Sequence, residues 1–159
     1  MKIELSDGGW ADVRDPRKLT ERQSEGLEDA QFELMLIPAV QDILRAKGND
    51  GFEKLQEEGD MGIALQLGVP GLKAMRGMRR ATVVAYVSAW SYSDHIDADA
   101  VMDAPSAIVN ELSNKIGEII KATGGSLVKT DPSPDPKALT SNSSESNGHL
   151  RVAPLTQGP

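Results

Sequence analysis

The spacing of apolar and polar residues divides the chain into a short amino-terminal segment, a helical middle and a polar tail. Residues 1–18 contain two short alternating runs on either side of residues 6–9, which end in two glycines. Glycine readily adopts the positive φ of a tight turn, so residues 1–18 are predicted to form a β-hairpin. Two strands alone are marginally stable in water, and this hairpin must therefore pack against another part of the chain.

Residues 19–128 carry apolar residues at helical spacing and are predicted to form a helical domain. Thr20 and Gln23 have the spacing of a capping box, in which two side chains satisfy free backbone N–H groups at a helix start. Pro38 removes one helical hydrogen bond, which predicts either a kink or two separate helices. The glycine-rich residues 48–51 and 68–71 are predicted breaks.

The strongest helix signal spans residues 72–90. Apolar residues cover most of its circumference, which is typical of a largely buried, central helix. The β-branched residues at 82–84 lower helix propensity, so a strand is an alternative prediction for this segment. We expect Val83, Val87 and Trp90 to hold the core.

A last helix is predicted after Pro105, because proline fits the first helical turn, where its missing N–H costs nothing. Residues 129–159 are rich in Pro, Ser and Asn and bury almost no apolar surface, so they are predicted to be a disordered tail. The fold class is therefore mainly α: a small helical domain with an N-terminal β-hairpin and a disordered C-terminal tail.

Composition narrows the function classes. The chain of 159 residues has a net charge of −7, which argues against a nucleic-acid-binding protein with a basic surface. It has no cysteine, which excludes disulfides and thiolate metal sites. It has no apolar run near the roughly 20 residues of a membrane span and no signal-peptide pattern, so we expect a soluble protein that does not bind membranes.

Charge is unevenly placed along the chain. Residues 61–93 contain no acid and have a net charge of +4, whereas residues 1–60 carry −7 and residues 94–128 carry −4. The basic residues of the middle segment are Lys73, Arg76, Arg79 and Arg80. This pattern favours pairing with the acidic flanks of the same chain, and is equally compatible with a partner that replaces one flank. Trp10 is a further candidate for partner binding, with packing against the core or Trp90 as the alternative.

Candidate chemistry is sparse. Asp97 and Asp99 have the first spacing of a calcium loop, but the glycine and the glutamate that the loop requires further on are absent. Helix capping and a solvated acidic loop are the favoured roles for these carboxylates and for Asp94 and Asp103. No motif for a cofactor or metal is present, and no nucleophile, base and electrophile lie together in the sequence, so we predict a protein without catalysis.

Three segments carry a resemblance to a known family. They are LSDGGWADVRDP at residues 5–16, VAYVSAWSY followed by IDADAVMDAP within residues 84–105, and the spacer DPSPDP at residues 131–136. Together they resemble the tail assembly chaperones of tailed bacteriophages that infect actinobacteria. The resemblance implies a mostly helical, non-catalytic protein of the host cytoplasm. Such a protein binds the tape-measure protein and tail-tube subunits and assists tail-tube polymerisation.

Several alternatives stay open beside this resemblance. A structural virion protein of the tail or head–tail region is one, and a nucleic-acid-binding regulator that uses the four bases is another. Self-association is also left open. Met61, Met75 and Met78 either form an adaptable binding surface or fill gaps in a core with few aromatic residues.

Overall fold

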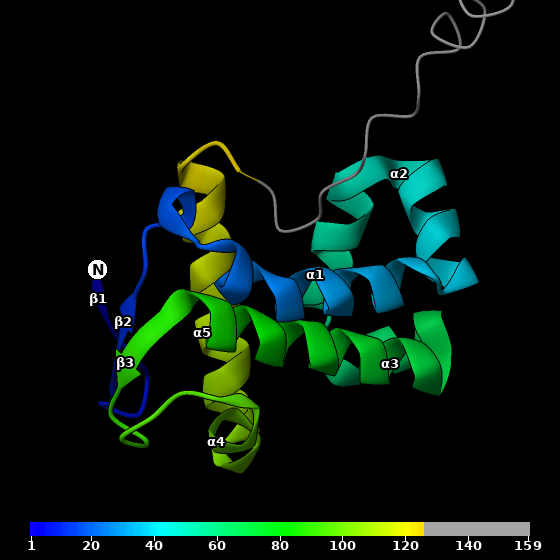
Figure 1. Ribbon diagram of the computed structural model, residues 1–159. Coiled ribbons are helices and arrows are strands. Elements are labelled where there is room, and N and C mark those ends of the chain that lie inside the picture. Colours follow the sequence, from blue (N-terminus) through cyan, green and yellow to red (C-terminus); the bar gives the residue numbers. More distant parts are fainter. Residues whose placement is uncertain (126–159) are drawn as a thin grey trace, which may run out of the picture. The chain divides into compact units, whose positions relative to one another are not determined.

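The computed structural model describes residues 1–125, and the tail predicted for residues 129–159 lies outside them. Its elements, in chain order, are β1 (Lys2–Glu4), β2 (Trp10–Val13), a 3₁₀ turn (Pro16–Lys18), α1 (Glu21–Met35), α2 (Pro38–Glu57), α3 (Gly59–Tyr86), β3 (Val87–Trp90), α4 (Ala98–Asp103) and α5 (Ser106–Ala122). The prediction of a mainly α domain that begins with a β-hairpin is confirmed (Figure 1).

The hairpin is part of a three-stranded antiparallel sheet in the order β1-β2-β3. The prediction of one helix over residues 72–90 was wrong, because α3 ends at Tyr86 and Val87–Trp90 form β3. Pairing decides the conformation: Ala11 of β2 lies opposite Trp90, and the Ser91 N–H donates to the Trp10 carbonyl oxygen at 3.0 Å. The third strand is thus the element against which the hairpin packs.

Proline and a capping pair define the first two helices. The backbone N–H of Thr20 donates to Gln23 Oε1 at 3.0 Å, as the capping box predicts. Pro38 is the first residue of α2, where it needs no hydrogen bond from its nitrogen, so the stretch around it forms two helices.

Two glycines bend the longer helices at the predicted breaks. Gly48 interrupts α2 with φ 62°, and Gly68 interrupts α3 with φ 72° and ψ −178°. Residues 60 and 76 would lie about 24 Å apart along a straight helix. The carboxylate of Asp60 instead accepts a hydrogen bond from Arg76 Nη2 at 2.7 Å, so α3 folds back on itself at Gly68.

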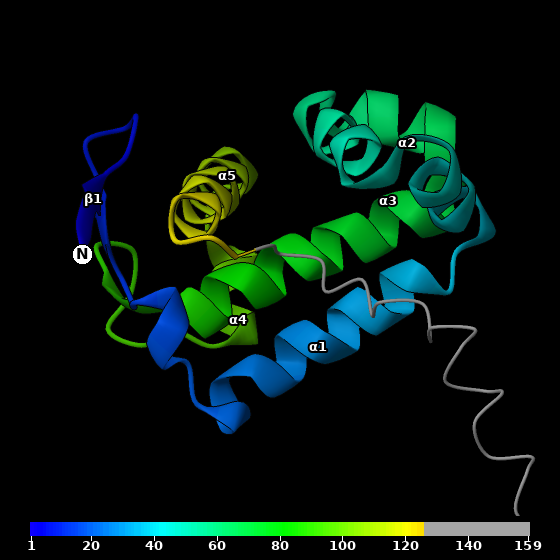
Figure 2. The same ribbon diagram turned by 90° about the horizontal axis from the view of Figure 1, so that it is seen from above.

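The second part of α3 is the centre of the domain. In Figure 2, α1 and α5 lie on opposite sides of it. One apolar cluster joins it to the sheet, α4 and α5, and contains Val83, Val87 and Trp90, which are buried as expected. A second cluster joins α1, α2 and both parts of α3.

The three methionines singled out above have different environments. Met75 and Met78 are buried in the second cluster and therefore fill the core, whereas Met61 is 76% exposed. Within residues 1–125, no helix is both long and apolar enough to cross a membrane.

Candidate functional site

The four predicted bases line one groove. Lys73, Arg76, Arg79 and Arg80 all come from the second part of α3, and the opposite wall is formed by α4 and the first turns of α5. The groove has a volume of about 660 Å³, within the range of about 300–1,000 Å³ that is usual for binding pockets. Its apolar lining includes Val69, Leu72, Val101, Met102 and Val109. The site therefore combines cations with an apolar floor, and we call it the basic groove.

Asp60 holds two of the four cations. Its carboxylate accepts a hydrogen bond from Arg79 Nη1 at 2.7 Å and two from Arg76, from Nε at 3.0 Å and from Nη2 at 2.7 Å. Burial acts to raise the pKa of Asp60, but the hydrogen bonds from Arg76 and Arg79 outweigh it, so the pKa lies below its ordinary value. Asp60 is thus ionised at neutral pH and fixes both guanidinium groups.

Arg79 differs from its three neighbours because it is buried. Its side chain is only 8% exposed, and Nη1 also donates to Asn110 Oδ1 of α5 at 3.1 Å. This guanidinium therefore connects the two parts of α3 through Asp60, and connects α3 to α5 through Asn110. Its role is structural, and it is less available to a partner than the other bases.

Lys73 and Arg80 carry the unpaired charge of the groove. Neither forms an ion pair within the described part of the chain, and Arg80 Nε donates only to the backbone oxygen of Arg76, at 3.3 Å. Four bases against the single carboxylate of Asp60 leave the groove lining with a formal charge of +3. The basic groove therefore attracts anionic groups, and Lys73 and Arg80 are the cations best placed to meet them.

An apolar ridge leads into the groove along α3. Met61, Leu65 and Val69 are 76%, 81% and 75% exposed, and Val69 also lines the groove. The first two lie one turn apart on the same face of the first part of α3, and Val69 follows the bend at Gly68. Large apolar side chains that are this exposed are typical of a protein-binding surface. We call these three residues the apolar ridge.

Trp10 does not line the basic groove. It is half-buried on β2, where the ammonium of Lys2 lies 4.4 Å from its ring centroid. Trp90 is buried, and its indole N–H donates to Ser93 Oγ at 3.0 Å. The two tryptophans thus have different roles, and the sheet end of the molecule is separate from the groove.

The hairpin turn is anchored by a network of polar side chains. The Tyr92 hydroxyl donates to Asp7, and the Ser6 hydroxyl donates to Glu111 Oε2 of α5 at 2.6 Å. Burial, followed by the Asp7 carboxylate, raises the pKa of Tyr92 to about 12. Hydrogen bonds from Ser6, and then from Lys115, lower the pKa of Glu111 to about 2. These contacts fix the turn to α5.

The acidic loop before α4 caps a helix. Asp97 Oδ1 accepts from the backbone N–H of Ala100 at 2.8 Å, as the sequence predicts. His95 Nε2 lies 3.6 Å from Asp97, and both side chains are mostly exposed. No cluster of three or more histidine or acidic residues within residues 1–125 is arranged to hold a metal ion.

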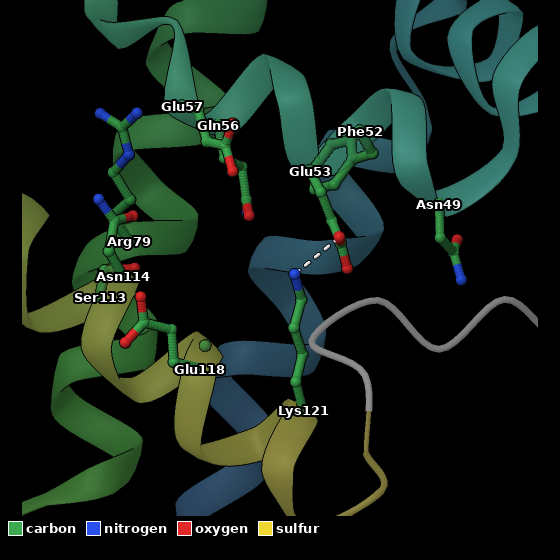
Figure 3. Close-up of a pocket in the computed structure, with 11 residues that line it drawn as sticks. Asn49, Phe52, Glu53, Gln56, Glu57, Arg79, Ser113, Asn114, Glu118 and Lys121 are labelled. Atoms are coloured by element: carbon green, nitrogen blue, oxygen red, sulfur yellow. Dashed lines mark ion pairs between the residues drawn. The ribbon is translucent and has the colours of Figure 1, made fainter.

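A second, smaller hollow of about 220 Å³ lies between α2 and α5. Figure 3 shows Lys121 of α5 reaching to Glu53 of α2, and the two side chains form an ion pair of 2.7 Å at the rim. Glu57, Glu118 and Arg79 also line it. Its lining has no histidine or cysteine and one serine, Ser113, which is buried, so it offers no evident nucleophile with a base.

Sequence reasoning found the cations but missed their partners. Asp60 gave no signal, because it lies 16 and 19 residues before the arginines that it binds. Asn110 and Met102 are brought to the groove by α5 and α4, which no local pattern connects to the basic segment. Comparisons of the chain with protein-family models, curated proteins and solved structures found no match.

Proposed function

We propose that this chain is a non-catalytic binding protein, a tail assembly chaperone that holds amphipathic helices of a tape-measure protein and assists tail-tube polymerisation. The observation that carries the proposal is the apolar ridge of Met61, Leu65 and Val69, whose last residue also lines the basic groove. A helical partner docks on such a surface through its apolar side, while charges at the edge fix its orientation. The three-segment resemblance supplies the identity of the partner.

The expected affinity suits a transient chaperone. Full burial of a Val, Leu or Met side chain contributes about 1.5–3 kcal/mol, so the ridge supplies roughly 5 kcal/mol before the costs of association. Contacts in the groove add to this value. Association itself costs at least about 4 kcal/mol, so a single partner helix is expected to bind weakly, which allows release when the tube subunits arrive.

The same groove is a poorer match to a nucleic acid. Arg79 is buried, and Arg76 and Arg79 already share the carboxylate of Asp60. Only Lys73 and Arg80 are left for phosphates, too few for the strong electrostatic term that dominates such binding. The apolar ridge also favours a protein partner over a nucleic acid.

The test is binding of tape-measure fragments of the same phage to the ridge. Met61→Ser/Leu65→Ser removes two exposed apolar side chains, and we expect at least tenfold weaker binding by calorimetry and loss of co-purification. Phe32→Ser/Leu36→Ser is the matched control, since this pair on α1 is similarly exposed and also one helical turn apart, and both variants are compared at a concentration at which the wild-type chain is monomeric. Wild-type affinity in the ridge variant, or no binding by the wild type, contradicts the proposal.

Mass spectrometry of purified virions separates this function from the structural alternative. A chaperone leaves the particle after assembly, so the chain should be absent or present in trace amounts. Stoichiometric presence in mature particles would favour the structural virion protein.

A further inference from the structure

Helix α1 presents two faces of opposite character. Successive residues of a helix are separated by about 100°, so Leu27 and Leu34 share one face, and both are buried against the core. The opposite face consists of exposed residues, namely Glu21, Arg22, Glu25, Asp29, Phe32, Glu33 and Leu36, among which four carboxylates outnumber one cation. We call these seven residues the acidic face of α1.

The acidic face carries two large apolar side chains among its carboxylates. Phe32 is 67% exposed and Leu36, the residue that caps the helix, is 61% exposed. They lie one turn apart, directly above and below each other on the helix surface. Glu25 and Asp29 lie on the same stripe, and neither forms an ion pair within the described residues. The face is therefore an amphipathic surface whose charged groups are mostly carboxylates, with Arg22 as its one cation.

This face and the basic groove are complementary. The groove lining has a formal charge of +3 and an apolar floor, and its volume of about 660 Å³ is large enough for two apolar side chains. The acidic face supplies carboxylates for Lys73 and Arg80 and two apolar side chains for the floor. No residue of α1 lines the groove, so the acidic face does not fill the groove of its own molecule.

We propose that the chain associates with further copies of itself, with the acidic face of α1 in one copy docked in the basic groove of the next. The proposed contact is heterologous and not a reciprocal two-fold pairing: each copy retains a free groove at one end and a free α1 at the other. Such a contact builds an open row of molecules, or a ring where its rotation closes, in contrast to a two-fold dimer. In this arrangement each apolar ridge stays outside the contact except at Val69.

The proposal does not rest on tape-measure binding, although a second copy and a partner helix would compete for the groove, and it is measured on the purified chain alone. Sedimentation velocity of residues 1–159 from about 1 μM to about 1 mM covers dissociation constants that correspond to about 4–8 kcal/mol. The sedimentation coefficient should rise with concentration and show no plateau at the dimer. A concentration-independent monomer, or a dimer that saturates, overturns the proposal.

Two variants each disable one of the surfaces. The groove variant is Lys73→Glu/Arg80→Glu, and the helix variant is Phe32→Ser/Leu36→Ser. Both should be monomeric where the wild type associates, with at least about tenfold weaker association, because one adds repulsion and the other removes the apolar contact. Circular dichroism verifies that each retains the wild-type helix content, and Lys73→Ser/Arg80→Ser replaces the groove variant if it does not.

An equimolar mixture of the groove variant and the helix variant gives the sharpest result. Only one productive contact is available, between the intact α1 of the first and the intact groove of the second. A 1:1 complex that does not grow with concentration supports the proposal. Failure of the two monomeric variants to form this complex overturns it.

Charge reversal on both surfaces provides the matching control. Glu25→Lys/Asp29→Lys alone should abolish association, and combining it with Lys73→Glu/Arg80→Glu in one chain should restore association. No recovery in the combined variant means that these charges do not meet, and overturns the pairing. The ridge variant Met61→Ser/Leu65→Ser should associate like the wild type, which separates self-association from partner binding.

Discussion

Substitution of Asp60 by alanine tests the reasoning about the buried arginine. The substitution leaves the Arg79 guanidinium, whose side chain is 8% exposed, with Asn110 as its remaining side-chain partner. Removing one partner of a fully buried ion pair costs about 3–5 kcal/mol. Asp60 is 35% exposed, so water reaches part of the vacated site and reduces the cost. We expect the free energy of unfolding to fall by about 2 kcal/mol.

Two further variants separate buried charge from the loss of contacts. Arg76 binds the same carboxylate but its side chain is 55% exposed, so Arg76→Ala should cost no more than about 0.5 kcal/mol. The double variant Asp60→Ala/Arg79→Met removes the buried charge together with its partner. It should therefore be more stable than Asp60→Ala alone, by about 1 kcal/mol.

Urea unfolding followed by circular dichroism measures these differences. With a slope of about 2 kcal/mol per molar, which is usual for a domain of this size, Asp60→Ala should lower the midpoint by about 1 M. The reasoning is refuted if Asp60→Ala unfolds within about 0.25 M of the wild type. It is also refuted if Arg79→Met makes the Asp60 variant less stable.

Two other predictions concern the core and the hairpin turn. Leu112 is fully buried in the first apolar cluster, so Leu112→Ala should lower the free energy of unfolding by about 3 kcal/mol. Met102 is exposed, so Met102→Ala should change it by less than about 0.5 kcal/mol. Urea unfolding measures both values. The pKa of Glu111 is about 2 in the folded chain, below its unfolded value of about 4.3, so its contribution is fully present above that value and is lost as the pH falls toward 2. The melting temperature of the wild type should therefore exceed that of Glu111→Gln at pH 6, and the difference should disappear near pH 2; a constant difference would contradict the assignment.

Local patterns were sufficient for most of the helices and for the hairpin. The capping pair at Thr20, the proline at position 38 and the glycines at positions 48 and 68 each act on their own backbone, so their effects are visible in sequence. The error at β3 has a different origin. A short apolar run fits a buried helix or a buried strand equally well, and the choice at Val87–Trp90 is made by pairing with a strand some 80 residues earlier.

The sequence predicted the charged residues of the candidate site but not their arrangement in space. An acid-free segment with four bases is readable from sequence, and all four line one groove. That Arg79 is buried, and that Asp60 neutralises part of the groove, depend on a contact between residues far apart on the chain. Trp10 was predicted to bind a partner from the hairpin; it lies on β2 and is not part of the groove lining. Residues that meet only through tertiary contacts produce no periodic pattern in the sequence.

The bend at Gly68 links the two proposed binding surfaces. Its φ of 72° with ψ of −178° falls in a region that is essentially restricted to glycine. The fold-back at this residue carries Asp60 to the arginines and places Val69 at the mouth of the groove. The exposed Met61 and Leu65 belong to the short helical part before the bend, which the Asp60 ion pairs hold against the second part of α3. Loss of that backbone conformation would therefore alter ridge and groove together, although no side chain at position 68 takes part in either surface.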